Sequence, residues 1–152
     1  TNYQQFAGKS LKELFADGEL KGAEEKLINP FESEYIENMG SGKFKISVLP
    51  SLAQISKIMV LRTEDVDKDG KLDVIIGGNF DGASMYQARY DAFFGLILKG
   101  DGKGHFKALI PTNTGLLLDG DVRDIKTVRT PKGPLYFVSR NNDHMQLFRK
   151  IP

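Results

Sequence analysis

The chain carries, between residues 65 and 79, the sequence DVDKDGKLDVIIGGN, in which an acidic turn leads directly into an apolar run. Asp and Gly favour tight turns, so residues 65–73 predict a turn between two strands. The run Val74-Ile75-Ile76 has no polar residue at alternate positions, which predicts a strand covered on both faces. This stretch therefore predicts a β-hairpin inside a protein whose sheets stack on one another.

The chain after residue 30 repeats this pattern of short apolar runs separated by clusters of Gly, Asp and Asn. Such a pattern is expected of hairpins in an antiparallel β domain. Residues 96–98 and 135–138 also lack alternation, so we expect them to be covered on both faces as well. The predicted strands lie near residues 35–38, 44–49, 57–63, 72–77, 94–99, 105–110, 123–129, 134–139 and 144–149.

The N-terminal part of the chain has a helical pattern instead. Ser10 followed three positions later by Glu13 is a signature of a helix start, and apolar residues after Ser10 share one helical face. We expect one short helix from Ser10 to about residues 17–18, and a second helical turn near residues 20–27. The predicted division is a helical N-terminal segment, residues 1–30, and a β region, residues 31–152.

The β region contains an internal repeat. Two segments share a G-x-G-x-F pattern, in which Gly40 aligns with Gly102 at an offset of 62 residues. The segments around Gly70 and Gly133 give an offset of 63 residues. A fixed period that contains four strands is typical of a β-propeller blade. The predicted units are a partial blade at residues 32–50, a full blade at residues 52–112 and a partial blade at residues 119–150.

The predicted fold class is therefore mostly β, with antiparallel four-stranded propeller-like blades and a short helical N-terminal segment. A β-sandwich built from the same strands is the alternative fold. The chain has 152 residues, which suits one domain but is short for a propeller of about six to eight blades. We therefore do not expect this chain to close a ring by itself.

Charge and composition argue against several classes of partner. The 21 Lys and Arg residues against 20 Asp and Glu residues give a formal net charge of +1, so no overall field attracts nucleic acid. No apolar run approaches the roughly 20 residues of a membrane helix, and no membrane insertion is predicted. The absence of cysteine excludes disulfides and thiolate metal sites. Because the chain begins at Thr1, we expect it to be processed or excised, with any targeting signal outside this chain.

The acidic turn has the spacing of a calcium loop. Carboxylates stand at loop positions 1, 3, 5 and 9, and the glycine at position 6 permits the bend that brings the last one back. The residue at position 7 can offer its backbone carbonyl. A bound dication would also remove the repulsion among these carboxylates. The predicted ligands of Ca²⁺ are Asp65, Asp67, Asp69, Lys71 and Asp73.

Other interpretations of this turn fit its residues less well. A helical EF-hand loop expects a bidentate Glu at position 12, which here is Ile76 in an apolar β run. Mg²⁺ demands stricter octahedral geometry. Asp-rich turns also arise simply because Asp and Gly make turns, but the full D-x-D-x-D-G-x-x-D spacing is more specific. We therefore expect a β-hairpin calcium loop whose ligand shell is completed by water.

Residues 65–79, together with the later G-x-G-x-F segment at residues 102–106, resemble the FG-GAP/VCBS repeat. The resemblance covers roughly residues 35–110 and, more weakly, residues 119–150. It implies a calcium-stabilised β-propeller blade of an extracytoplasmic protein, periplasmic, secreted or on the cell surface, that serves in recognition or as a scaffold. The third unit departs from the motif, because residues 130–134 replace the acidic loop and imply no second metal there.

A long connection between two predicted strands, residues 85–94, is a candidate binding surface. Tyr86, Arg89 and Tyr90 are of types that are enriched at interfaces. The alternative is that this loop packs back on its own blade.

An acidic stretch near the third unit has three interpretations. It could form a second cation site, contact a polar ligand, or be a turn and strand entry with local ion pairing, which is the interpretation we favour. The residues concerned are Asp119, Asp121, Arg123 and Asp124.

The sequence contains no recognisable catalytic constellation. There is no G-x-S-x-G motif, and the only histidines, His105 and His144, lack metal-ligand spacing. We therefore expect a structural rather than catalytic metal, and no enzyme activity. The alternative is a carbohydrate-active or carbohydrate-binding domain in which Ca²⁺ supports a glycan site. The expected partner is an unidentified protein or glycan, and exposed edge strands make self-association plausible.

Overall fold

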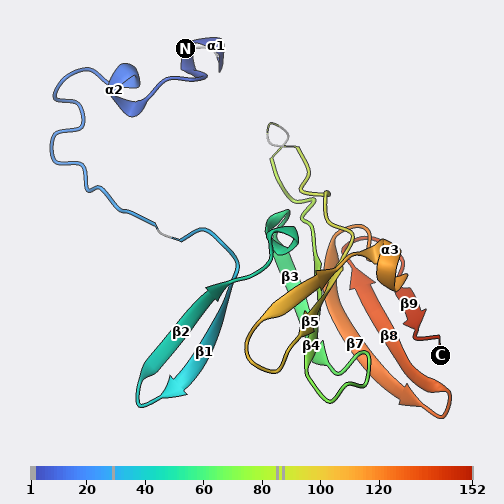
Figure 1. Cartoon of the computed structure of the whole chain (residues 1–152). Helices are drawn as coiled ribbons and strands as arrows, with labels where there is room; N and C mark the ends of the chain where they lie inside the picture. The colour runs from blue at the N-terminus through green and yellow to red at the C-terminus, as the bar shows by residue number, and fades with distance from the viewer. Residues whose placement is uncertain (1–2, 29, 85, 87, 152) are drawn as a thin grey trace. The chain divides into compact units, whose positions relative to one another are not determined.

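The computed structural model describes residues 3–28, 30–84, 86 and 88–151. The chain folds as two units, Thr1–Phe31 and Glu32–Pro152. The second unit is mostly β and contains three antiparallel sheets (Figure 1). The prediction of a mostly β fold is therefore confirmed.

The first unit contains two one-turn helices, α1 (Tyr3–Phe6) and α2 (Leu11–Leu14). The predicted helix start at Ser10 is confirmed, because the Glu13 carboxylate accepts a hydrogen bond from the Ser10 backbone N–H at 2.7 Å. A hydrogen bond from the Ser10 hydroxyl, together with this backbone bond, lowers the pKa of Glu13. The predicted second helical turn at residues 20–27 is wrong. Gly22 has a φ of 85°, a left-handed conformation that an α-helix does not tolerate.

In the described residues of the second unit there are nine strands, one near each predicted position. They pair with their neighbours in the chain, so each sheet is an antiparallel meander. The two-stranded sheet contains β1 (Glu34–Gly40) and β2 (Lys43–Val48). The four-stranded sheet contains β3 (Ile58–Glu64), β4 (Asp73–Gly78), β5 (Leu96–Gly100) and β6 (Phe106–Leu109). The three-stranded sheet contains β7 (Val122–Thr130), β8 (Gly133–Arg140) and β9 (Gln146–Arg149).

Two short helical segments connect the sheets. The 3₁₀ segment η1 (Ser51–Gln54) precedes the four-stranded sheet, and α3 (Pro111–Thr114) follows it. Neither segment was predicted from the sequence. Pro111 at the first helical position and the left-handed Gly115 just after the end are the signals that mark α3.

The middle of the four-stranded sheet is covered on both faces, as the lack of alternation predicted. Ile75 and Ile97 lie in one apolar cluster, together with Val122 of β7. Ile76 and Leu98 lie in a second cluster on the opposite face. The same prediction is only partly correct for β8, whose buried side chains alternate with half-buried ones. The four- and three-stranded sheets thus share a core.

Equivalent positions of the internal repeat adopt equivalent backbone conformations. Gly40 and Gly102 have φ values of 81° and 73°. Asn79 and Asn142, which follow β4 and β8, have φ values of 72° and 54°, a region that non-glycine residues seldom adopt and in which asparagine is enriched. The spacing then diverges, because residues 79–95 separate β4 from β5 by a longer connection than the one between β8 and β9.

Among the described residues the three sheets do not close into a ring (Figure 1). None of the helices in this part of the chain has the length and apolarity that crossing a bilayer requires.

Candidate metal centre

The acidic loop connects two paired strands at one end of the four-stranded sheet (Figure 1). The last residue of β3, Glu64, is paired with the first residue of β4, Asp73. Between them the chain turns through two left-handed residues, Lys68 with a φ of 65° and Gly70 with a φ of 84°. Gly70 adopts this conformation without steric cost, which explains the glycine at loop position 6.

Backbone N–H groups hold the first carboxylates of the loop in place. The two oxygens of Asp65 accept hydrogen bonds from the N–H groups of Asp69, at 3.1 Å, and Gly70, at 2.9 Å. Asp67 Oδ1 accepts a bond from the same Asp69 N–H at 3.2 Å. These bonds curl the loop around its own carboxylates.

Asp73 is buried and fastens the loop to the sheet. Its side chain accepts one bond from the N–H of Val66, at 2.9 Å, and one from the N–H of Gly100, at 3.0 Å. A Cβ atom at position 100 would lie 2.2 Å from the carbonyl oxygen of Leu72, so only glycine fits there. Because Gly100 ends β5, Asp73 links the loop to a strand far away in the sequence.

Three of the predicted aspartates converge on one point. One carboxylate oxygen each from Asp65, Asp67 and Asp73 lies within 4.8 Å of the other two. Calcium binds oxygens at about 2.3–2.6 Å, so ligands on opposite sides of one ion lie about 5 Å apart. The spacing of these three hard oxygens therefore fits one Ca²⁺ ion.

The structure does not bring Asp69 into this group. Its Oδ1 accepts a hydrogen bond from the N–H of Lys71 at 3.0 Å, and its Oδ2 lies 3.7 Å from the ammonium of Lys71. The two residues at loop positions 5 and 7 thus contact each other. Their predicted role as ligands remains a prediction.

Lys99 is a part of the site that the sequence analysis missed. Its ammonium donates a hydrogen bond to Asp67 and lies 3.3 Å from Asp69 Oδ2. The bond from Lys99 lowers the pKa of Asp67, and the bonds to Asp67 and Asp69 raise the pKa of Lys99. Lys99 follows an apolar run in the sequence, but only the pairing of β4 with β5 brings it beside the loop. A calcium ion in the loop would compete with this ammonium for Asp67.

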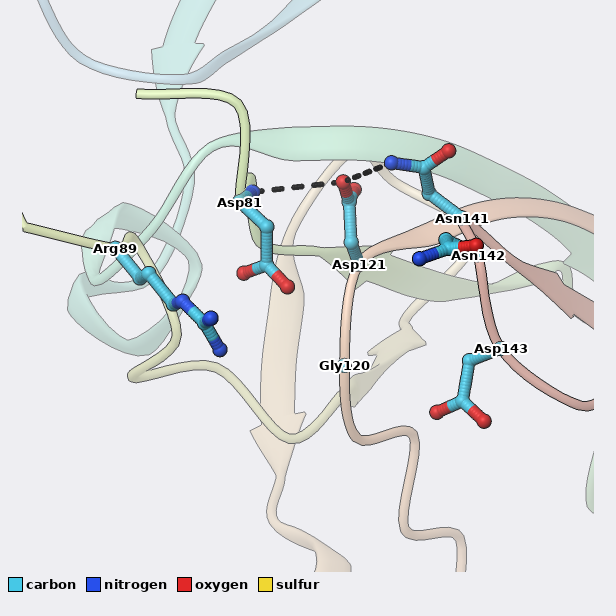
Figure 2. A pocket seen from close by; sticks show the side chains of 7 residues that line it. All are labelled: Asp81, Arg89, Gly120, Asp121, Asn141, Asn142 and Asp143. Carbon is cyan, nitrogen blue, oxygen red and sulfur yellow. Dashed lines mark hydrogen bonds between the residues drawn. The ribbon is translucent and has the colours of Figure 1, made fainter. Parts of the chain in front are cut away.

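The other candidate residues lie elsewhere. Tyr86 is exposed, and Tyr90 forms an isolated β-bridge with Phe80. Arg89 lines a polar cavity together with Asp121 (Figure 2).

The acidic stretch near the third unit has the local ion pairing that we favoured. Asp121 lies 2.6 Å from Arg123, and Asp124 lies 3.2 Å from Lys126. Asp119 pairs with Arg140 at 3.1 Å. Asp121 also takes part in the polar cavity, which the favoured interpretation did not include.

Comparisons with protein-family models, with curated proteins and with solved structures found no match to this chain. Its function therefore has to be inferred from the geometry of its own residues.

Proposed function

We propose that this chain is a calcium-binding β-repeat module of the FG-GAP/VCBS type, in which the metal stabilises the loop and the module serves in recognition or as a scaffold. The observation that carries the proposal is the convergence of the Asp65, Asp67 and Asp73 oxygens within 4.8 Å. Carboxylate oxygens are the ligands that Ca²⁺ prefers, and a β-hairpin loop leaves room for water to complete the shell.

A structural role for the metal follows from how its ligands are held. Asp73 is already fixed by two backbone N–H groups, one of them from β5, and Asp65 by two N–H groups of the loop. An ion bound between them would join the loop, β4 and β5 into one unit. Because binding to the folded state alone shifts the folding equilibrium, such an ion stabilises the module.

The number of ligands favours an environment that is rich in calcium. Sites with few protein ligands bind calcium weakly, and extracellular modules work at dissociation constants of about 10⁻⁴–10⁻³ M. Three converging carboxylates suit this range better than that of an intracellular calcium sensor. We therefore propose an extracytoplasmic location for the module.

The arrangement of the sheets supports blades of the propeller type. The four-stranded and three-stranded sheets pack against each other, and a Cβ atom added at Gly77 of β4 would lie 2.8 Å from a methyl carbon of Val122 in β7. This close approach and the shared core give two neighbouring sheets in contact, as in consecutive blades. Further blades, or a second copy of the chain, would be needed to complete a ring.

Calorimetric titration of the chelator-treated protein with CaCl₂ tests the proposal. We expect one Ca²⁺ per chain to bind, and we expect Asp67→Ala to abolish this binding. Asp124→Ala is the matched control, because Asp124 is also a partly exposed carboxylate paired with a lysine, 3.2 Å from Lys126. The proposal fails if the wild-type protein binds no calcium, or if both variants bind it as the wild type does.

A further inference from the structure

A polar cavity of about 330 Å³, shown in Figure 2, lies near the C-terminal end of β4, whereas the acidic loop precedes the start of that strand. Its volume falls at the lower end of the range for small-molecule sites, about 300–1,000 Å³. Three segments build it: the base of the connection at residues 79–95, the residues just before β7, and the turn between β8 and β9. The lining residues are Asp81, Arg89, Gly120, Asp121, Asn141, Asn142 and Asp143.

The base of the long connection is rigidly held. Phe80 and Tyr90 exchange two backbone hydrogen bonds, at 2.9 and 3.2 Å. Asp81 follows Phe80 and Arg89 precedes Tyr90, so these two residues lie on the two facing segments of the loop, one on each. The buried Asn79 donates to the carbonyls of Phe93, at 2.6 Å, and Gly120, at 3.1 Å. These contacts fasten the loop base to the segment before β7.

Asp121 is the centre of the cavity, and one of its carboxylate oxygens lacks a partner. The residue is only 2% exposed. Its Oδ2 accepts bonds from Arg123, at 2.6 Å, and from Asn141, at 3.3 Å, whereas Oδ1 is buried and has no hydrogen-bond partner among the described residues. A buried acceptor without a partner is costly, so a movement of Asp121 that uncovers Oδ1 to the cavity would let it accept a donor from a ligand. Figure 2 shows Asp121 between Asp81 and Asn141.

The charges around the cavity are nearly balanced. Arg123 neutralises Asp121, and Arg140 lies 2.9 Å from Asp143. Asp81 and Arg89 form no ion pair within the described part of the chain, and both line the cavity. The cavity therefore presents acceptors and donors of both signs but little net charge.

This balance argues against an ion as the occupant. Within residues 3–28, 30–84, 86 and 88–151, only the acidic loop brings three carboxylates within reach of one metal, so Asp81, Asp121 and Asp143 lie too far apart to ligate one ion together. A phosphate finds no net positive charge in a cavity whose carboxylates balance its arginines. A neutral ligand that is larger than an ion and carries several hydroxyl groups meets both constraints, because each hydroxyl donates one hydrogen bond and accepts two.

We propose that this cavity binds a neutral saccharide. Sugar hydroxyls donate to Asp81 and Asp143, and one donates to Asp121 Oδ1 once binding has uncovered that atom. Arg89 and the Asn142 amide donate to sugar oxygens. The left-handed conformation of Asn142, with a φ of 54°, fixes the turn that carries two of these side chains. The proposal names a ligand for the recognition role proposed above and rests on that role, but it does not involve the acidic loop.

Ligand-observed NMR of the full chain with D-glucose, D-galactose, D-mannose and N-acetyl-D-glucosamine at millimolar concentration tests this proposal. We expect saturable binding of at least one of these sugars. Asp81→Asn and Arg89→Ala should each weaken it about fivefold, the effect of one hydrogen bond. Asp121→Asn should weaken it about tenfold or more, because a buried charged acceptor is lost. Arg129→Ala, at the far end of β7, is the control and should leave binding unchanged.

One further measurement separates this proposal from the calcium proposal. Asp67→Ala should still bind the sugar, because Asp67 lies outside the cavity. Sugar binding that persists in this variant upholds the cavity even if the wild type binds no calcium. The proposal is overturned if no sugar in the panel binds, if the cavity variants bind as the wild type does, or if calcium, glycine or inorganic phosphate occupies the cavity instead.

Discussion

The connections β3–β4 and β7–β8 occupy the same place in consecutive repeats, yet they are built differently. The first spans residues 65–72 and is acidic, whereas the second contains only Pro131 and Lys132 between the strands. Gly70 and Gly133, which the repeat aligns, both have left-handed conformations, with φ values of 84° and 100°. In the short turn the Thr130 hydroxyl donates to the Gly133 carbonyl at 2.7 Å and accepts from the Lys132 N–H at 3.2 Å.

This difference shows that the acidic residues are not needed to connect two paired strands. A neutral hydroxyl and one glycine close the β7–β8 hairpin, so joining two strands does not require four aspartates. The acidic loop instead gathers carboxylates whose mutual repulsion is offset by backbone N–H groups and, among the ion pairs of the described residues, by Lys99 and Lys71. The excess of negative charge at one of two equivalent positions is the physical basis of the proposed calcium site.

The largest effect on stability is expected at Asp73, the buried aspartate that follows the acidic connection at the start of β4. Asp73→Ala leaves the N–H groups of Val66 and Gly100 without their acceptor in a buried position. We expect the free energy of unfolding to fall by about 2–4 kcal/mol, measured by urea denaturation in the presence of chelator. Thr130→Val in the short turn is the control and should cost about 1 kcal/mol or less, since its bond to Gly133 is only partly buried and its bond from Lys132 is exposed. Equal losses of unfolding free energy in the two variants would contradict the proposed difference between the two connections.

Removal of calcium should have the next largest effect. An ion present at a hundred times its dissociation constant stabilises the folded state by about 2.7 kcal/mol. For a chain of this size chelator should then lower Tm by about 5–10 °C. In Asp67→Ala the Tm should not respond to chelator, whereas in Lys132→Ala it should respond as in the wild type. A wild-type Tm that does not change with chelator would show that no stabilising calcium ion distinguishes the acidic connection from the short one.

Substitution of Lys99 should have a smaller effect and should strengthen calcium binding instead of removing it. The ammonium of Lys99 occupies Asp67 and lies beside Asp69, so calcium has to displace it. Lys99→Met should therefore bind calcium about two- to fivefold more tightly, as expected from the loss of one exposed ion pair. Lys126→Met, which removes an ion pair to Asp124 outside the loop, should not change the affinity. Weaker binding by Lys99→Met would mean that Lys99 supports the ion rather than competing with it.

The smallest effect is expected in acid. The bond from Lys99 holds the pKa of Asp67 below its ordinary value of 3.8 in the folded protein. Its contribution to stability is therefore complete above about pH 4 and is lost as the pH falls through the lower, folded pKa. Carbon-detected NMR of the side-chain carboxyl should give a pKa below 3.8 for Asp67, and Lys99→Met should raise it. An ordinary pKa in the wild type would show that the contact with Lys99 does not persist in solution.

Local pattern was enough to predict the strands and the acidic loop. Turn residues and unalternated apolar runs place the nine strands, and the spacing of Asp65, Asp67 and Asp73 predicts their convergence. The N-terminal prediction failed after α2, because propensity over residues 20–27 did not weigh the left-handed glycine within that range.

Features that depend on distant pairing could not be predicted in the same way. Lys99 and Gly100 reach the acidic loop only because β5 pairs with β4 across the long connection at residues 79–95. Asp121 was placed in a local ion pair, but its cavity also needs Asp81 and the turn after β8. No periodicity in the sequence indicates which loops meet at one end of two neighbouring sheets.

Diffraction from crystals grown in millimolar calcium, with anomalous data that locate the ion, tests the central claim most directly. We expect one Ca²⁺ among the oxygens of Asp65, Asp67 and Asp73 at about 2.3–2.6 Å, with the Lys99 ammonium withdrawn from Asp67. If the ammonium of Lys99 still bridges Asp67 and Asp69 in those crystals and no anomalous peak lies in the loop, the claim is contradicted.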